Sequence, residues 1–147
     1  MEKIYLDVCS LCRPFDDQNY ARIRIETDAV NLILSKVRLK KYSMLKSPVH
    51  FKEIEAINDD FERIELIHLL ATYGTMHEYD SNSVKGRTEI LISNNFGIAD
   101  AAHIAFSETF GSCFISCDDK LIKKCNNSQI SIDCMNPVMF CEMEKLK

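Results

Sequence analysis

The sequence predicts an α/β protein with a mostly parallel central sheet that helices cover on both faces. Short apolar segments alternate along the chain with longer segments whose apolar residues recur every three or four positions. The first apolar segment, residues 3–8, lacks the polar alternation of a half-exposed strand, which favours a strand buried on both faces. The length of 147 residues suits one domain, expected over residues 1–147.

The first half of the chain should contain two strands and three helices. A break at residues 13–15 and a turn at residues 16–17 separate the first strand from a helix with apolar positions from Ile23 to Val37. Residues 42–45 are a second, weaker strand candidate. Ser47-Pro48 is typical of a helix start, and Asn58 or Asp59 should cap the next helix, which Gly74 ends.

The second half continues the alternation. We expect helices over residues 81–93, 98–106 and 118–125, with a loop at residues 94–97 and with Gly111 ending the second of these helices. Strands are expected over residues 113–116 and 130–132. Strands that alternate with helices favour a parallel sheet with helices on both faces.

The composition is that of an ordinary globular protein, with 46% hydrophobic and 27% charged residues. No apolar run approaches the roughly 20 residues that span a bilayer, and the N-terminus lacks the pattern of a signal peptide, so we expect a cytoplasmic protein. The seven cysteines are odd in number and, in a reducing compartment, do not suggest a disulfide framework. Cys9 and Cys12 form a C-x-x-C, but no second Cys/His pair completes a zinc site.

The net charge of −4 argues against a protein that binds duplex nucleic acid by bulk electrostatics alone. One local basic cluster has two interpretations, a solvated helix end, slightly favoured, or an RNA contact. This cluster comprises Lys36, Arg38, Lys40, Lys41 and Lys46. Arg13 has two candidate partners, the turn acids Asp16 and Asp17 or a phosphate.

Several acidic residues are expected near the carboxyl ends of the strands, where ligands of parallel sheets usually bind. Asp7 ends the first strand and Asp118 follows the strand at residues 113–116, so both should reach the carboxyl edge of the sheet. Asp100 begins the helix that leads into that strand, and Glu53 lies on the helix after the second strand. Taken singly, Asp100 and Asp118 have an alternative interpretation as helix caps, and Glu53 as a solvated residue.

Carboxylates that gather at one edge repel each other. At about 4 Å and an effective dielectric constant near 20, each pair costs roughly 4 kcal/mol before relaxation. A hard divalent cation offsets this cost, and oxygen ligands favour Mg²⁺ or Mn²⁺ over zinc. The matching chemistry is metal-assisted attack of water on a phosphodiester. The sequence therefore predicts an acidic metal site for hydrolysis.

Four segments carry a resemblance to a known family. They are YLDVCSLCRPFDDQ at residues 5–18, IADAAHIA at residues 98–105, FISCDDKL at residues 114–121 and NPVMF at residues 136–140. Together they resemble the PIN-domain family, in its VapC-like ribonuclease toxin branch. The resemblance spans nearly the whole chain. It implies a PIN-like three-layer α/β/α sandwich, a homodimer, ribonuclease activity and an antitoxin partner.

The resemblance also assigns site residues. Asp7, Asp100 and Asp118 match the family's metal-binding acids, and Glu53 fits the second acid, with Glu55 and Glu26 as competitors. Three residues would support the site. They are Ser116, which stands where the family often has threonine or serine, Asp119 beside the last acid, and Ser10, because Cys9 occupies a position that is often asparagine or serine.

The function that follows is a Mg²⁺- or Mn²⁺-dependent endoribonuclease that cleaves single-stranded or structured RNA. The alternative is a PIN-like module that binds RNA or a protein without cutting. A receiver-like phosphotransfer domain is disfavoured because only Asp7 ends the first strand. His103 is interpreted as a packed or surface histidine and Phe96 as a core anchor.

Overall fold

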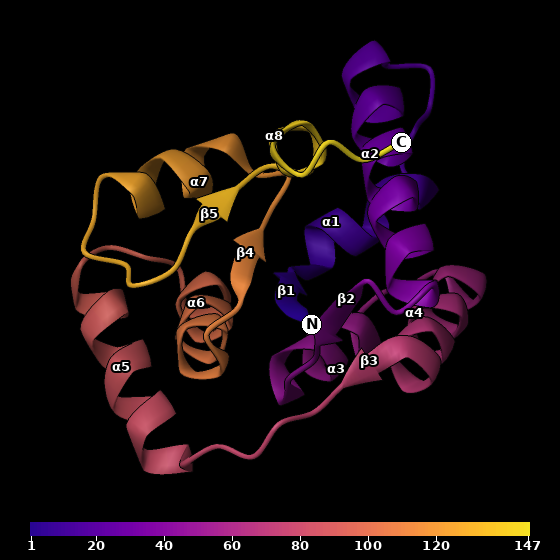
Figure 1. Ribbon diagram of the computed structural model, residues 1–147. Coiled ribbons are helices and arrows are strands. Elements are labelled where there is room, and N and C mark those ends of the chain that lie inside the picture. The colour runs from indigo at the N-terminus through magenta and orange to yellow at the C-terminus, as the bar shows by residue number, and fades with distance from the viewer.

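Five parallel strands form one sheet in the order β3-β2-β1-β4-β5 in the computed structural model, which describes residues 1–147 (Figure 1). The strands are β1 (Glu2–Leu6), β2 (Tyr42–Leu45), β3 (Gly74–Thr75), β4 (Cys113–Ile115) and β5 (Cys134–Met135). The central strand β1 pairs with β2 and with β4, placing Ile4 opposite Met44 on one side and opposite Cys113 on the other. Residues just after β1 and β4 therefore emerge side by side.

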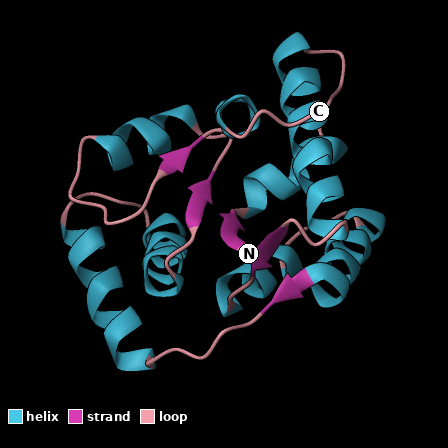
Figure 2. Cartoon of the chain, viewed as in Figure 1, coloured by secondary structure: helices cyan, strands magenta, loops and turns pink.

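Helices make up most of the rest of the chain and surround the sheet (Figure 2). They are α1 (Val8–Cys12), the 3₁₀ helix η1 (Arg13–Phe15), α2 (Ala21–Arg38), α3 (Pro48–Glu55), α4 (Asp60–Tyr73), α5 (Ser81–Ser93), α6 (Ile98–Phe110), α7 (Asp119–Asn126) and α8 (Pro137–Met143). Ser47 caps α3, Asp59 caps α4, and α5 covers the segment expected to be helical. Gly111 ends α6 in the left-handed conformation, with φ of 66°.

The alternation of side chains along β1 separates two hydrophobic cores, as the pleat of a strand requires. Ile4 and Leu6 pack with residues of α2, α4 and α8 on one face. Tyr5 packs with residues of α5 and α6 on the other. Ile4, Tyr5 and Leu6 are each at most 1% exposed. The result is the expected three-layer α/β/α sandwich with a PIN-like fold.

Two strand predictions were wrong. The last strand lies at Cys134–Met135 and not at residues 130–132, because Ile130 and Ile132 are partly buried side chains that pack on the core from a bent segment outside the sheet. The first strand ends at Leu6, and helix α1 follows directly. A two-residue strand is too short to produce an alternation, so neither β5 nor β3 left a signal in the sequence.

None of the helices combines the length and apolar character needed to cross a membrane.

Candidate acidic site

Asp7 stands at the point where β1 gives way to α1. Its backbone N–H donates to the Ile115 carbonyl at 3.2 Å, which ties it to the end of β4. Its Oδ1 accepts from the Ser10 amide at 3.1 Å and from the Ser10 hydroxyl at 2.8 Å, so Asp7 caps α1. The Ser10 hydroxyl oxygen also accepts from the Cys117 amide at 3.1 Å. Ser10 therefore fixes a carboxylate that is only 4% exposed.

Asp118 occupies the matching place after β4. Its Oδ1 accepts from the Leu121 amide at 3.1 Å and caps α7. The Ser116 hydroxyl oxygen accepts from the Asp118 amide at 3.0 Å, so Ser116 supports this acid through its backbone. The Cys9 thiol lies 3.2 Å from Asp7 Oδ1 and 3.6 Å from the Ser116 hydroxyl, between the two strand ends.

Asp100 lies in the first turn of α6 and does not cap it, since Gly97 holds that position. Burial raises the pKa of Asp100, the negative charges of Asp7, Asp118 and Glu53 raise it further, and His103 partly offsets the rise. Carboxylates from four separate segments thus act on one another electrostatically. A cavity of about 180 Å³ opens beside them, with Asp100 and Asp118 on its wall together with Lys120 and Lys124.

Glu53 reaches this region from α3 through a contact with a histidine. Its Oε1 lies against Nε2 of His103, one turn along α6 from Asp100. His103 is 1% exposed, so its interpretation as a packed residue is confirmed, but the ring is fully hydrogen-bonded: Nδ1 lies 2.6 Å from the Tyr5 hydroxyl. The spacing of Asp100 and His103 places both on one helix face. The partners on β1 and α3 could not be read from the sequence.

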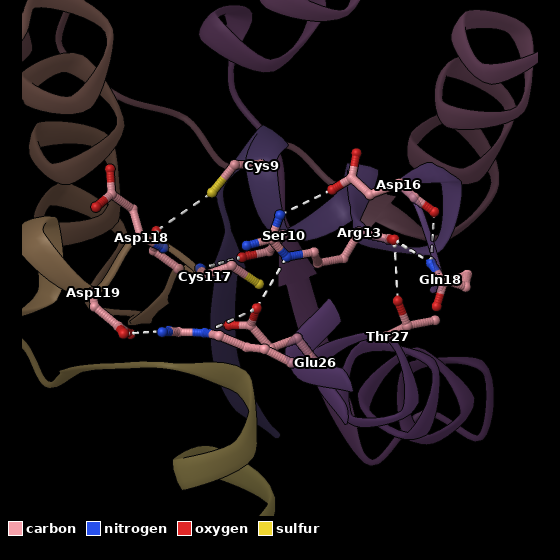
Figure 3. Close-up of polar contacts among 12 residues, drawn as sticks. Cys9, Ser10, Arg13, Asp16, Gln18, Glu26, Thr27, Cys117, Asp118 and Asp119 are labelled. Atoms are coloured by element: carbon pink, nitrogen blue, oxygen red, sulfur yellow. Dashed lines mark hydrogen bonds and ion pairs between the residues drawn. The ribbon is translucent and has the colours of Figure 1, made fainter. Parts of the chain in front are cut away.

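The competing acids are placed elsewhere. Glu26 is buried on α2 and accepts from the Arg13 guanidinium at 3.1 Å, and Arg22 lies 3.6 Å away (Figure 3). Arg13 also donates to Asp16 at 2.9 Å, so one of the two turn acids is its partner in the folded chain. Glu55 is exposed near the end of α3.

Asp119 points away from Asp118, as Figure 3 shows, and pairs with Arg22 of α2. This ion pair joins α7 to α2. Asp119 therefore has a partner of its own, and its expected support of the neighbouring acid has no contact to act through.

The acids do not form a finished set of ligands. No group of three or more His, Cys, Asp or Glu side chains lies close enough together to hold a metal ion. Asp7 and Asp118 each direct one oxygen to a helix cap, and mutual repulsion keeps like charges apart. The donor chemistry nevertheless fits Mg²⁺ or Mn²⁺, because Asp7, Asp100, Asp118 and Glu53 all offer carboxylate oxygens.

Cys9 contacts Asp7, but most of the basic cluster lies apart from the acidic site. All seven cysteines are free. Arg38, Lys40 and Lys41 precede β2, at the amino edge of the sheet and opposite the acids, which favours the solvated helix end. Lys46 follows β2, and its ammonium group donates to the Leu70 carbonyl at 3.2 Å. Phe96 is 4% exposed, in agreement with a core anchor.

Comparison with known proteins shows a likeness in fold. No family model and no curated protein matches the chain by sequence. The crystal structure of FitAcB from Neisseria gonorrhoeae is 11% identical, with 91% of this chain and 97% of that chain covered and a TM-score of 0.54. The structure of FitAB bound to an IR36 DNA fragment is 12% identical, with coverages of 92% and 95% and a TM-score of 0.55. At these identities the likeness establishes the shared fold.

Proposed function

We propose that the protein is a Mg²⁺- or Mn²⁺-dependent endoribonuclease of the PIN type. The observation that carries this proposal is that Asp100 and Asp118 line one open cavity, with Asp7 and Glu53 near enough to act on Asp100 electrostatically. Asp7, Asp118 and Glu53 come from different segments, and each raises the pKa of Asp100. A divalent cation bound in the open cavity would offset this repulsion between the carboxylates.

Each acid would have a distinct part in holding the ion. Asp7 is buried and fixed by Ser10, so it offers a rigid carboxylate. Asp118 has one oxygen on the cap of α7 and makes no hydrogen bond with the other. Asp100 and Glu53 stand on facing helices, α6 and α3. When bound, the ion would activate water and stabilise the oxygen that leaves the phosphodiester.

Lysines beside the acids favour a nucleic-acid substrate. Lys120 and Lys124 line the same small cavity as Asp100 and Asp118. Ammonium groups at this position would hold the phosphates on either side of the scissile bond. A single strand of RNA suits this site, because a net charge of −4 argues against duplex binding by bulk electrostatics alone.

The toxin assignment is part of the proposal. It rests on the resemblance to VapC-like PIN domains and on the fold shared with FitAB. An antitoxin protein would then be the physiological partner, and the toxin would act as a homodimer. Expression of the chain alone in bacteria should arrest growth, and Asp100→Asn should remove the arrest.

Asp100→Asn is the sharpest test of cleavage, because this side chain makes no hydrogen bond within the chain and the variant should fold normally. With Mn²⁺ and a mixed-sequence single-stranded RNA, we expect at least about 100-fold slower cleavage than for the unmodified protein. Asp28→Asn is the matched control, since Asp28 is exposed on α2. Equal rates for Asp100→Asn and the unmodified protein would overturn the proposal.

The alternative is a PIN-like module that binds RNA or a protein without cutting it. One observation favours it: no three potential ligands meet closely enough to hold an ion. This reading predicts that the unmodified protein binds the same RNA in a gel-shift assay but leaves it intact with Mg²⁺ and with Mn²⁺. The endoribonuclease proposal predicts fragments with either ion.

A further inference from the structure

A buried chain of hydrogen bonds connects Glu53 to the centre of the sheet. The His103 ring lies between Glu53 on α3 and Tyr5 on β1, with Nε2 against the carboxylate and Nδ1 2.6 Å from the phenol oxygen. The Tyr5 hydroxyl continues to the Ser47 hydroxyl, 2.7 Å away. Tyr5, Ser47 and His103 are each at most 1% exposed. These hydrogen bonds therefore join α3, α6 and β1 through three buried side chains, and only the Glu53 end is partly exposed.

The partners fix where the protons lie. A carboxylate accepts hydrogen bonds, so Nε2 of His103 carries its proton toward Glu53. With Nε2 as the only protonated ring nitrogen, Nδ1 accepts from the Tyr5 hydroxyl, which leaves the Tyr5 oxygen to accept from Ser47. Every bond runs in the same direction, toward Glu53. This arrangement selects one tautomer and one ring plane.

A second histidine holds the first in place by packing. The ring centroid of His50 is 5.0 Å from that of His103 and 4.6 Å from that of Tyr5. His50 Nε2 lies 2.7 Å from the Leu6 carbonyl, and its Nδ1 accepts from the Ser47 amide at 3.0 Å. His50 is thus bound to the backbone on both sides and forms a fixed wall for His103.

Glu53, at the end of these hydrogen bonds, contacts His103 one helical turn from Asp100. Asp100 and His103 are three residues apart on α6 and share one face of that helix. The Glu53 side chain is 36% exposed, so without a partner it would sample several rotamers. Contact with the immobile His103 ring reduces the rotamer freedom of the Glu53 side chain.

We propose that His103 is a positioning residue that orients the Glu53 carboxylate toward the ion, with Tyr5 and Ser47 fixing the ring. The inference rests on the proposed function, because it takes Glu53 as one of the metal-binding acids. Hydrogen-bond partners of metal-binding groups typically change metal affinity or activity 10–100-fold when they are replaced. We expect an effect of that size on Mn²⁺ affinity from the loss of His103.

A double-mutant cycle on Mn²⁺ binding, measured by isothermal titration calorimetry, tests the proposal. His103→Leu replaces the imidazole with an apolar side chain of similar bulk. It should weaken Mn²⁺ binding about 10–100-fold. His103→Gln retains an N–H donor and should recover part of the loss. Glu53→Gln combined with His103→Leu should bind no more weakly than Glu53→Gln alone, because His103 acts through Glu53. His68→Leu, at an exposed histidine of α4, is the control.

Two results would overturn the positioning role. One is unchanged Mn²⁺ affinity in a folded His103→Leu protein. The other is a full additional loss from His103→Leu in the Glu53→Gln background, which would mean that His103 acts on the site by another route. Tyr5→Phe removes only the hydroxyl that orients the ring, so it provides a second, milder variant with an expected severalfold loss if His103→Leu does not fold.

A measurement without metal separates this inference from the proposed function. Nitrogen-15 NMR of the His103 ring should show a protonated Nε2 and an unprotonated Nδ1, with Nε2 shifted in Glu53→Gln. Protonation at Nδ1 alone would overturn the hydrogen-bond chain itself. Absence of Mn²⁺ binding by the unmodified protein, with the expected tautomer, would overturn the metal site and the role of His103 toward it, while the hydrogen bond to Glu53 would stand.

Discussion

Asp100 is half-buried, receives no hydrogen bond from the chain and lies within the influence of three other acids. Burial and these neighbouring charges disfavour its charged form, and His103 offsets only part of that effect. The position in the first turn of α6 offers some compensation, because the amino end of a helix favours negative charge. The raised pKa shows that repulsion and burial outweigh that compensation.

This balance predicts opposite effects of Asp100→Asn with and without metal. The pKa of Asp100 is higher in the folded protein than in the unfolded chain, so its contribution to stability is present at acid pH and is lost as pH rises through that pKa. At pH 7 without metal, the variant should be more stable by up to about 1 kcal/mol, an ordinary size for a single substitution.

Mn²⁺ should reverse the order. An ion that binds only the folded state stabilises it according to its affinity, so the unmodified protein should gain more than the variant. Urea unfolding at pH 7 in EDTA and then in excess Mn²⁺ measures both effects. A variant that is less stable than the unmodified protein in EDTA would contradict the electrostatic account.

At the scale of elements, the parts visible in the sequence were those with long periodic patterns or clear caps. The helix at residues 81–93, the Ser47-Pro48 start of α3 and the Gly111 end of α6 were all confirmed. The short strands β3 and β5 depend on pairing with β2 and β4, which no local pattern records. Asp7, Asp100 and Asp118 could be named from sequence, whereas the Tyr5–His103–Glu53 contacts required the packing of three elements.

Helix α3 is attached to the sheet through His50, and this attachment has a predicted cost. His50→Ala removes the partner of the Leu6 carbonyl and of the Ser47 amide, both buried, and leaves a cavity. Each unpaired buried group costs about 1–3 kcal/mol, so the variant should lose roughly 2–5 kcal/mol of unfolding free energy. Urea unfolding at pH 7 measures the loss, and His68→Ala should change stability little.

The same histidine should make stability fall in mild acid. Burial and the neighbouring His103 lower the pKa of His50 from 6.5 to about 3. In this pH range His50 is protonated in the unfolded chain but not in the folded protein. The free energy of unfolding therefore decreases as pH falls from about 6.5 toward 3. The decline between pH 6.5 and 5 should be shallower in His50→Ala, and an equal slope in both proteins would remove His50 as its cause.

At the scale of the whole molecule, an apolar groove of about 490 Å³ lies between α3 and α6. Glu53 forms part of its wall, and Ile98, 76% exposed, stands at its edge. The proposed homodimer would bury this apolar surface beside the acidic site.

A charge in that groove should therefore separate the copies. Ile98→Glu places a carboxylate where the second copy would cover it, and we expect at least a tenfold shift of the dimer dissociation constant toward monomer. Ile90→Glu, on α5 and 52% exposed, should leave assembly unchanged. Light scattering coupled to size exclusion measures both, and an unaltered dimer in Ile98→Glu would place the interface elsewhere.

Asp7 and Asp118 each cap a helix in addition to their proposed part in the acidic site. Finding these two acids in another protein is therefore weak evidence of activity. A relative without the proposed nuclease activity would still need both acids to cap α1 and α7. Asp100 caps no helix, and its charge lowers the stability of the folded state. Without selection for activity, Asp100 should therefore be lost before the other two acids. Among sequences that share this architecture, an aspartate at that position is the better sign of a working enzyme.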